Sequence, residues 1–493
     1  MLVDHNGQPL TARKQTRTVR ARYDSAGHDV DMARHWQMTD SLSAVRANSE
    51  SVRRKLRERS RYEVSNNSYA RGAINTIADY KVGAGPTLQL TYRGESEPND
   101  SLIDLRRAAQ RVEWLWASWA YERRLTQKLW TASVALDQDG EAFALLQTND
   151  QSSRHTVVSL DVRLFECDQF ADPSGGWEQD DSGVRLGPDG QPSEYSILRA
   201  HPGDDAMFTG QQADWLPASQ VIHCFRRERP GQLRGIPRTT PALPLFAQLR
   251  AYILATLTAA ETAADYAAIL YSDSPGEDEE QFEPWDRLEI QRGALLSVPG
   301  GSRLAQLKAE HPTATFDEFV KAILREIARC MSIPAVLMLG DASGYNYASG
   351  RLDLQSFQRA LAVDRTQILE REFLDKTWEA WLAEALLIPG FLPDEFAETS
   401  EDWEFGWRWS EPEHVDRAKE ATGQQIELAN NTTTLAREFA KRGQDWETEL
   451  RQRARELELQ RQLGLPINEG VMPQAEQDKQ AGGFATKDED EDD

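Results

Sequence analysis

Cysteine and long apolar runs are both scarce in this chain. Its 493 residues include three cysteines, Cys167, Cys224 and Cys330, which lie far apart and are odd in number. They predict small buried hydrophobic side chains rather than a disulfide framework, as in a reducing cytoplasm. The N-terminus lacks the apolar segment of a secretory signal peptide. Threonines and carboxylates interrupt the longest apolar stretch, residues 251–270, so we expect no membrane-spanning helix and no membrane partner.

The recurrent motifs of enzymes are also missing. There is no G-x-x-x-x-G-K-[ST] phosphate loop, which argues against an ATP-driven motor, and no H-E-x-x-H, paired C-x-x-C, G-x-S-x-G or dinucleotide fingerprint. The eight histidines do not cluster, and we expect His201 and His223 to be exposed or structural. The chain is therefore expected to have no enzyme activity, catalytic residue, metal or cofactor. A metal-dependent nuclease is the alternative, because such enzymes can lack a strong local motif.

Positive charge is in the minority. The chain has 56 lysines and arginines against 80 carboxylates, a net charge of −24. This balance argues against a protein that holds DNA by neutralising phosphates. It fits simple solubility, and it also fits a wall past which DNA slides. The polar ends of the chain, residues 1–30 and 466–493, are expected to form a flexible arm and a disordered acidic tail.

One segment, Met32–Tyr62, departs from this acidic character. Its pattern is helical and strongly basic, which we interpret as a solvated face. A surface for a partner or for nucleic acid is the less favoured alternative. The basic residues are Arg53, Arg54, Lys55, Arg57, Arg59 and Arg61.

Helical and strand periods alternate along the first half and predict an α+β fold. Apolar residues spaced as on one helix face predict helices, and alternating stretches predict the strands of an antiparallel sheet. The helices are expected at 67–82, 102–120 and 129–136, and the strands at 87–92, 141–148, 157–165, 195–199 and 221–225.

In the second half, two long helices are expected at 241–268 and 315–331. The first is rich in alanine, which is typical of a helix in a bundle or at a ring interface. Between them lies a compact insert with strand patterns and an acidic turn, 273–280. Three further helices are expected at 415–428, 432–441 and 445–463.

The chain is organised around a helix, a turn-rich segment and a second helix in residues 313–386. Pro334 ends the first helix, because proline disfavours helical geometry in the residue before it. The segment 336–350 consists of small, turn-forming and aromatic residues. The second helix is expected over 351–386, and its middle, 364–367, is polar all round. Such a helix is expected to be kinked or to pass between two environments.

Several short motifs occur in a characteristic order and spacing. The most specific is Arg229-Pro-Gly-Gln-Leu-Arg-Gly-Ile-Pro237. Others are Asn66-Asn-Ser-Tyr-Ala-Arg-Gly-Ala-Ile74, Val82-Gly-Ala-Gly85, Asp139-Gly-Glu-Ala-Phe143, Val221-Ile-His-Cys-Phe225 and Tyr345-Asn-Tyr-Ala-Ser-Gly-Arg351. Together they resemble the lambda-type family of phage portal proteins over roughly residues 40–465. Many members have Tyr-Ser-Ser-Ala-Arg where this chain has Tyr347-Ala-Ser-Gly-Arg351, a small-residue change.

The resemblance implies a portal fold and assigns its parts to the elements above. The wing, which combines antiparallel β structure with helices, would comprise residues 30–240. Residues 350–410 would form a long helix and the rest of the wing. The other parts would be stem helices at 241–268 and 314–332, a small α/β clip at 269–313, a tunnel loop at 333–349 and a helical crown at 411–465.

The resemblance also implies a role and partners. Portal proteins form a ring, a dodecamer in the particle, at one capsid vertex of a tailed phage or prophage. Double-stranded DNA is packaged and ejected through that ring without sequence recognition. The implied partners are the terminase large subunit, head-completion and connector proteins, and major capsid and scaffolding proteins. The protein would reside in the virion after assembly in the host cytoplasm.

Three groups of residues are candidate sites. The clip acids Glu277, Asp278, Glu279 and Glu280 would dock the motor, since an acidic patch suits a basic partner. The tunnel segment lacks lysine and arginine, so it would touch DNA weakly, with Asp341 repeated round the ring as an anionic girdle. The tunnel residues are Leu339, Gly340, Asp341, Ser343, Gly344, Tyr345, Asn346 and Tyr347, and the motif-loop residues are Arg229, Pro230, Gly231, Gln232, Arg234 and Gly235.

Two other classes of protein compete with this assignment. One is an enzyme of the packaging or lysis region, such as a metal-dependent nuclease or a cell-wall hydrolase. The other is an acidic scaffolding protein, which is disfavoured because scaffolds are mostly helical and the strand content here is substantial.

Overall fold

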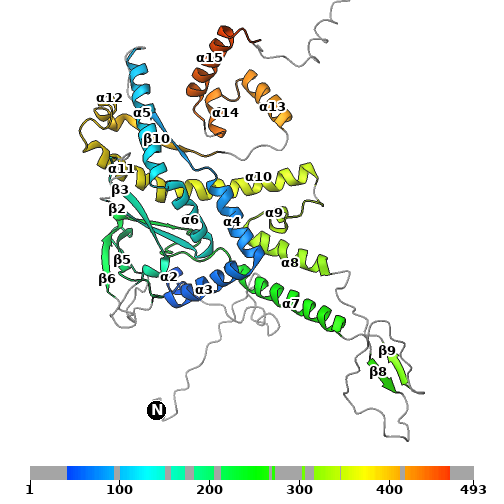
Figure 1. Ribbon diagram of the computed structural model, residues 1–493. Helices are drawn as coiled ribbons and strands as arrows, with labels where there is room; N and C mark the ends of the chain where they lie inside the picture. Colours follow the sequence, from blue (N-terminus) through cyan, green and yellow to red (C-terminus); the bar gives the residue numbers. More distant parts are fainter. Residues whose placement is uncertain are drawn as a thin grey trace, which may run out of the picture.

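The computed structural model shows helices and antiparallel sheets around three apolar cores (Figure 1). The α+β class with antiparallel pairing is therefore confirmed. The residues that the structure describes are 41–93, 100–149, 157–171, 183–204, 212–265, 269–272, 302–305, 316–344, 346–410, 417–442 and 444–466.

The first core lies between a three-stranded sheet and helices from both halves of the chain. The sheet has the order β3–β2–β7, and all its pairs are antiparallel. Trp116 and Trp119 of α5 pack beside Trp378 and Trp381 from the far end of the chain. The indole N–H of Trp119 donates to the carbonyl of Leu160, so this buried polar group is paired. The elements are α5 (Asp100–Glu122), α6 (Leu125–Gln138), β2 (Glu141–Thr148), β3 (Leu160–Phe165) and β7 (Val221–Phe225).

A second three-stranded sheet closes the other face of β2. Its order is β4–β5–β6. Phe143 of β2 stacks between Phe170 and His223, with ring centroids 3.9 and 4.1 Å away. The elements here are β4 (Val184–Leu186), β5 (Pro192–Leu198) and β6 (Ala213–Pro217), with short 3₁₀ turns η3 (Cys167–Gln169) and η4 (Ala218–Gln220).

A two-stranded ladder joins distant parts of the chain. β1 (Thr87–Tyr92) pairs antiparallel with β10 (Trp403–Arg408), so that Thr87 lies opposite Arg408. We did not predict β10, although its aromatic residues alternate with polar or small ones. The aromatic rings of β10 pack against the first core.

Two long helices run side by side away from the body (Figure 1). They are α7 (Leu243–Asp265), which follows the turn η5 (Thr240–Ala242), and α8 (Phe316–Met331). Tyr252 of α7 contacts Phe316 and Phe319 of α8. At their base they share the second core with α3 (Glu50–Asn66) and α4 (Ser68–Val82). At their outer end lies the hairpin β8 (Ile269–Ser272) and β9 (Ser302–Ala305).

The long helix changes character in its middle. α10 (Tyr347–Asp364) continues as a π-helix, η6 (Arg365–Leu374), and then as α11 (Asp375–Leu386). Phe357 belongs to the second core, whereas Trp378 belongs to the first. The expected passage between two environments is confirmed. The remaining short elements are α2 (Ala44–Ala47), α9 (Ala335–Leu339), α12 (Asp394–Ala397) and η7 (Ser400–Asp402).

The three C-terminal helices have almost no core of their own. They are α13 (Arg417–Ala429), α14 (Leu435–Lys441) and α15 (Trp446–Gln462). In the described part of these helices, no apolar side chain is fully buried. Arg106 of α5 lies 2.8 Å from Glu447, and Arg408 of β10 donates to the carbonyl of Gln444. Polar contacts of this kind attach the three helices to the rest of the chain.

A half-buried carboxyl beside this attachment, that of Glu113, should make stability pH-dependent. The pKa of Glu113 is raised to about 7, mainly by burial; the Leu90 N–H opposes the rise, Asp445 adds to it and Arg408 opposes it. Folding therefore favours the protonated form. The stabilisation is complete below the unfolded pKa of about 4.5 and is lost as the pH rises through 7. In the wild type, this carboxyl should lower the free energy of unfolding by about 2–3 kcal/mol between pH 4.5 and pH 8. Glu113→Gln cannot ionise at this position, so the variant should not show this fall.

Thermal unfolding of both proteins across this pH range measures the effect. The control is Glu398→Gln, which changes an exposed carboxylate and should leave the pH profile as in the wild type. Parallel profiles for the wild type and Glu113→Gln would contradict the assignment.

Candidate functional site at the junction of long helix and sheet

The segment expected as a tunnel loop is shorter than the sequence indicated. Residues 335–339 form α9, and Leu339 is packed at the edge of the second core. Pro334 begins this helix as its N-cap, and Gly340 ends it in the left-handed conformation with φ +65°. Among the described residues, the irregular part is therefore 340–344 with Asn346. The proline and glycines of this segment predicted a loop and not α9, because a helix of five residues shows too little periodicity in the sequence.

Asp341 is ionised but is not an isolated charge. Hydrogen bonds from Ser343 and an interaction with Lys321 lower the pKa of Asp341 to about 2. The ammonium of Lys321 on α8 lies 3.2 Å from the Asp341 carboxylate. Asp341 is the only charged residue of the segment 333–349, as expected from the sequence, but α8 supplies a counter-charge beside it. Ser343 and Gly344 beside it are exposed.

Asn346 begins the long helix. Its side chain accepts the Ser349 N–H, and the Ser349 hydroxyl oxygen accepts the Asn346 N–H, which makes a capping box. Tyr345, the side chain of Tyr347 and the clip acids Glu277, Asp278, Glu279 and Glu280 lie outside the described residues.

The motif loop folds on itself around Gln232. The amide oxygen of Gln232 accepts the N–H groups of Glu228 and Arg229, and its NH₂ donates to the Arg234 carbonyl. Arg229 donates to the carbonyl of Leu42, which ties the loop to the start of the described chain. After Pro230, Gly231 turns the chain with φ +75°.

Two motifs that lie far apart in the sequence meet through glycines. Gly140 has φ +91°, and a Cβ on it would lie 2.2 Å from the carbonyl carbon of Ile236. A Cβ on Gly235 would lie 2.1 Å from the Gly140 oxygen. Neither position has room for a side chain, because two backbones touch there.

Next to these glycines lies a buried ion pair. Arg234 donates twice to Glu141, over 2.8 and 2.6 Å, and also to the Phe170 carbonyl. Burial alone would raise the pKa of Glu141, but Arg234 and His223 outweigh it and hold the pKa well below its usual range. Burial lowers the pKa of His223 to about 4, so its ring is neutral at pH 7. Arg57 of α3 lies 3.6 Å from Glu141.

A second buried group of charges anchors the long helix. Lys81 donates to Asp137 over 2.7 Å and lies 3.3 Å from Asp364, the last residue of α10. Arg226 bonds the same Asp364, and the guanidinium of Arg365 donates to the carbonyls of Tyr80 and Lys81. The polar middle of the long helix is thus a buried ionic contact with α4, α6 and the chain after β7. We call both groups together the charge junction.

The basic run in α3 belongs partly to this junction. The expectation of a solvated face was wrong for Arg53 and Arg57, each 1% exposed, and confirmed for Arg54, Lys55 and Arg59. Arg57 pairs with Glu50 and with Asp168. Helix periodicity alone could have shown two arginines on the inner face. Arg53 pairs with the nearby Glu50, but Asp168, a partner of Arg57, lies far along the chain.

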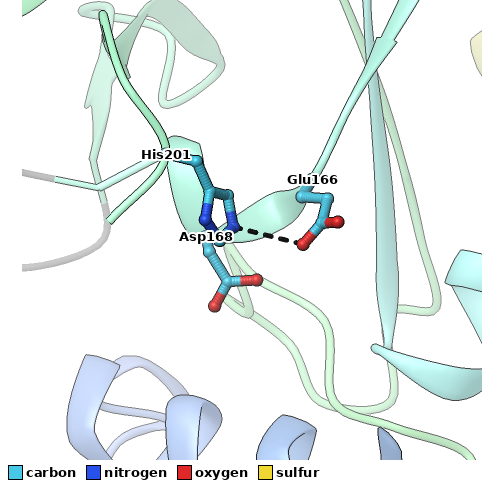
Figure 2. Close-up of side chains that lie close together, drawn as sticks. All are labelled: Glu166, Asp168 and His201. Atoms are coloured by element: carbon cyan, nitrogen blue, oxygen red, sulfur yellow. Dashed lines mark ion pairs between the residues drawn. The ribbon is translucent and has the colours of Figure 1, made fainter. Parts of the chain in front are cut away.

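Glu166, Asp168 and His201 lie close enough together to suggest a metal site (Figure 2). However, a guanidinium already occupies the cluster, since Arg61 lies 2.7 Å from Asp168 and 3.4 Å from Glu166. The Nδ1 of His201 accepts the Gly203 N–H, so in the neutral ring the proton is on Nε2, which lies 3.2 Å from Glu166. Neither ring nitrogen then offers a lone pair, and the donor set does not fit a cation. These three residues do not support the nuclease alternative.

The outer half of α7 exposes apolar residues. Leu254 and Leu257 are 57% and 55% exposed. The stretch Thr240–Glu261 is long and apolar enough to cross a membrane by length and composition. Near its middle, Arg250 donates to Glu63 of α3 over 2.6 Å, which ties α7 to the body of the protein. Large exposed apolar flanks mark surfaces that another molecule covers.

Comparison with known proteins agrees with the motifs. Residues 31–365 match the family model described as phage portal protein, lambda family. The chain is 22% identical over 456 residues to portal protein B of Escherichia phage lambda, covering 82% of this chain and 83% of that protein.

Solved structures with a similar course of the chain are more distant. The neck of a native GTA particle is 14% identical, with a TM-score of 0.42, over 76% of this chain and 88% of that one. A HK97-family phage portal protein from Corynebacterium diphtheriae is 15% identical, with a TM-score of 0.32, over 63% and 90%. The family match covers more than half of the sequence and includes the motif loop, Gly140 and most of the charge junction, and the chain therefore belongs to the lambda family of phage portal proteins.

Proposed function

We propose that the protein forms a closed ring at one capsid vertex, twelvefold in the particle, through which double-stranded DNA is packaged and ejected. The observation that carries this proposal is the exposed apolar flank of α7 in a member of the portal family. A ring with one repeated interface pairs two different faces of each subunit, so it needs an apolar surface that stays uncovered in a single chain.

The segment 340–346 acts by shape in this proposal. It carries no lysine or arginine, and its one carboxylate already interacts with Lys321. Such a segment neither attracts phosphates strongly nor repels them as a bare acidic ring would. DNA can then pass it without a chemical step, which agrees with a protein that is not an enzyme.

The insert 269–313, with Glu277, Asp278, Glu279 and Glu280, is the proposed docking surface for the terminase large subunit and later for head-completion and connector proteins. Its hairpin β8–β9 lies at the outer end of α7 and α8, away from the body (Figure 1). The wing side would face major capsid and scaffolding proteins. The protein would assemble in the host cytoplasm, without a membrane, and reside in the virion.

The mass of the purified assembly tests the ring. Mass photometry of the wild type should show a particle many times the 55.7 kDa chain. Leu254→Gln with Leu257→Gln places polar groups on the α7 flank, so most of the protein should shift to single chains.

The matched control replaces two exposed leucines on other surfaces, Leu186→Gln with Leu387→Gln, and should keep the ring. A wild-type protein that has the mass of one chain at every salt and protein concentration would contradict the proposal.

A further inference from the structure

A cavity of about 310 Å³ lies between the end of α8, the beginning of α9 and the middle of α10. It is separate from the charge junction. On the same helix, one turn before Arg325, Lys321 lies 3.2 Å from Asp341 of the segment 340–346, so the cavity is close to that segment along α8. Phe357, Ile333 and Pro334 contribute apolar walls, and Arg325, Arg329 and Asp353 contribute the charges. The volume is at the lower end of the range for small-ligand sites.

The two arginines of the cavity are exposed and unused within the subunit. In the described part of the chain, neither Arg325 nor Arg329 has an ion pair or hydrogen bond through its side chain. They lie four residues apart on α8, and Lys321 is four residues earlier, so all three share one flank. The helical rise places successive members about 6 Å apart.

The other polar groups complete a donor set. Ser332 and Ser356 line the cavity, and Asp353 is its one acidic residue, so the lining has a net positive charge. Ser332 has φ +57°, a left-handed conformation that usually selects glycine and costs a serine about 1 kcal/mol. This conformation belongs to the end of α8, where the Ile333 N–H donates to the Ala328 carbonyl, and it places Ser332 in the lining of the cavity.

We propose that this cavity binds a backbone phosphate of DNA. The proposal rests on the proposed function, since it places the phosphate contact beside the segment that DNA passes. Guanidinium and hydroxyl donors are the groups that proteins use for backbone phosphates, and they read no sequence. The cavity is large enough for one tetrahedral phosphate with its sugar, but too small for a folded acidic protein segment.

The contact complements the steric role of 340–346. The segment itself offers no cation to the phosphates, whereas Arg325 and Arg329 offer two per subunit, repeated round the ring. The result is a weak, salt-dependent hold on DNA that is independent of sequence.

Fluorescence anisotropy with a short fluorescein-labelled DNA duplex of mixed sequence tests the site over a salt titration. The test variant is Arg325→Gln with Arg329→Gln. We expect its affinity at low salt to fall about tenfold or more, and the slope of log Kd against log salt to fall by about two, one per lost phosphate contact. The control, Arg437→Gln with Arg455→Gln, removes the same charge from exposed positions on α14 and α15 and should bind as the wild type does.

The competing explanations give different results. Equal losses in the control would mean a general effect of charge and would overturn the site. Displacement of the duplex by inorganic phosphate at constant ionic strength would assign the cavity to free phosphate instead of DNA. A test variant that loses the ring, with mass photometry on the same samples, would assign the arginines to a subunit contact. A wild type without a ring would overturn the proposed function itself, and unchanged binding by an intact ring would overturn only this inference.

Discussion

Replacing Arg234 with methionine is expected to lower the free energy of unfolding by about 3–5 kcal/mol, because it leaves Glu141 buried without its main partner. Arg234 is 2% exposed, and water cannot replace the two hydrogen bonds that it donates to the Glu141 carboxylate. The carbonyls of Phe170 and Cys167 also lose a donor. Thermal unfolding, followed by tryptophan fluorescence, measures the loss as a large drop of the midpoint.

Two further variants distinguish the effect of breaking the buried ion pair from the effect of losing any arginine. Arg107→Met removes a guanidinium that is 71% exposed and pairs with Asp104, and should cost less than about 1 kcal/mol. The double variant Glu141→Gln with Arg234→Met removes the orphaned charge and should recover part of the loss. If Arg234→Met unfolds at the same midpoint as Arg107→Met, the junction is not the support that its geometry indicates.

Gly140→Ala is expected to prevent folding or to destabilise the protein by more than about 4 kcal/mol. The new Cβ would lie 2.2 Å from the backbone of Ile236, which no rotation of a side chain can relieve. The loop with Arg234 and Gly235 would have to move away from β2 and take the buried ion pair with it. Soluble yield and the circular dichroism spectrum measure the outcome.

Gly231→Ala is the matched control. Gly231 belongs to the same motif loop and also has a positive φ, +75°, but nothing lies within 4 Å of the position of its Cβ. It should therefore cost only the left-handed strain, about 1 kcal/mol. Similar losses in both variants would show that conformation alone, and not the approach of two backbones, requires glycine at 140.

Local patterns predicted most of the regular elements, because each element carries its own periodicity. Alternation gave β2 at Glu141–Thr148 and β7 at Val221–Phe225 with the bounds that the structure has. The 3.6-residue period likewise located α8 within one residue of Phe316–Met331. In each case the apolar face of the element can be recognised from its own residues, whichever element packs against it.

Contacts between distant segments could not be predicted in the same way. Arg57 looked like part of a solvated face because its partners Glu141 and Asp168 lie far along the chain. The polar middle of the long helix indicated a change of environment but not the buried pair of Asp364 with Lys81. A charge pattern gives the sign of a side chain, whereas its burial depends on a three-dimensional neighbour.

The candidate site was predicted in part. Gly340 begins the irregular segment that contains Asp341, as its turn chemistry indicated, whereas the long helix begins at Tyr347 with Asn346 as its cap, and not at 351. The arginines of the cavity, Arg325 and Arg329, were not singled out, because on a helix with mixed charges they resemble ordinary surface residues. The four-residue spacing of Lys321, Arg325 and Arg329 was the available signal.

The pairing of β1 with β10 fixes the order of events while the chain is being synthesised. Thr87 emerges from the ribosome early, yet its partner Arg408 follows only after most of the chain has been made. Until then the aromatic rings of β10 cannot cover the first core, and α4 lacks its contacts with Asp364 and Arg365. Pairings over such distances form slowly, and the exposed core is open to wrong association in the meantime. A nascent subunit thus completes its body late, and only finished chains can present a correctly formed surface to their neighbours.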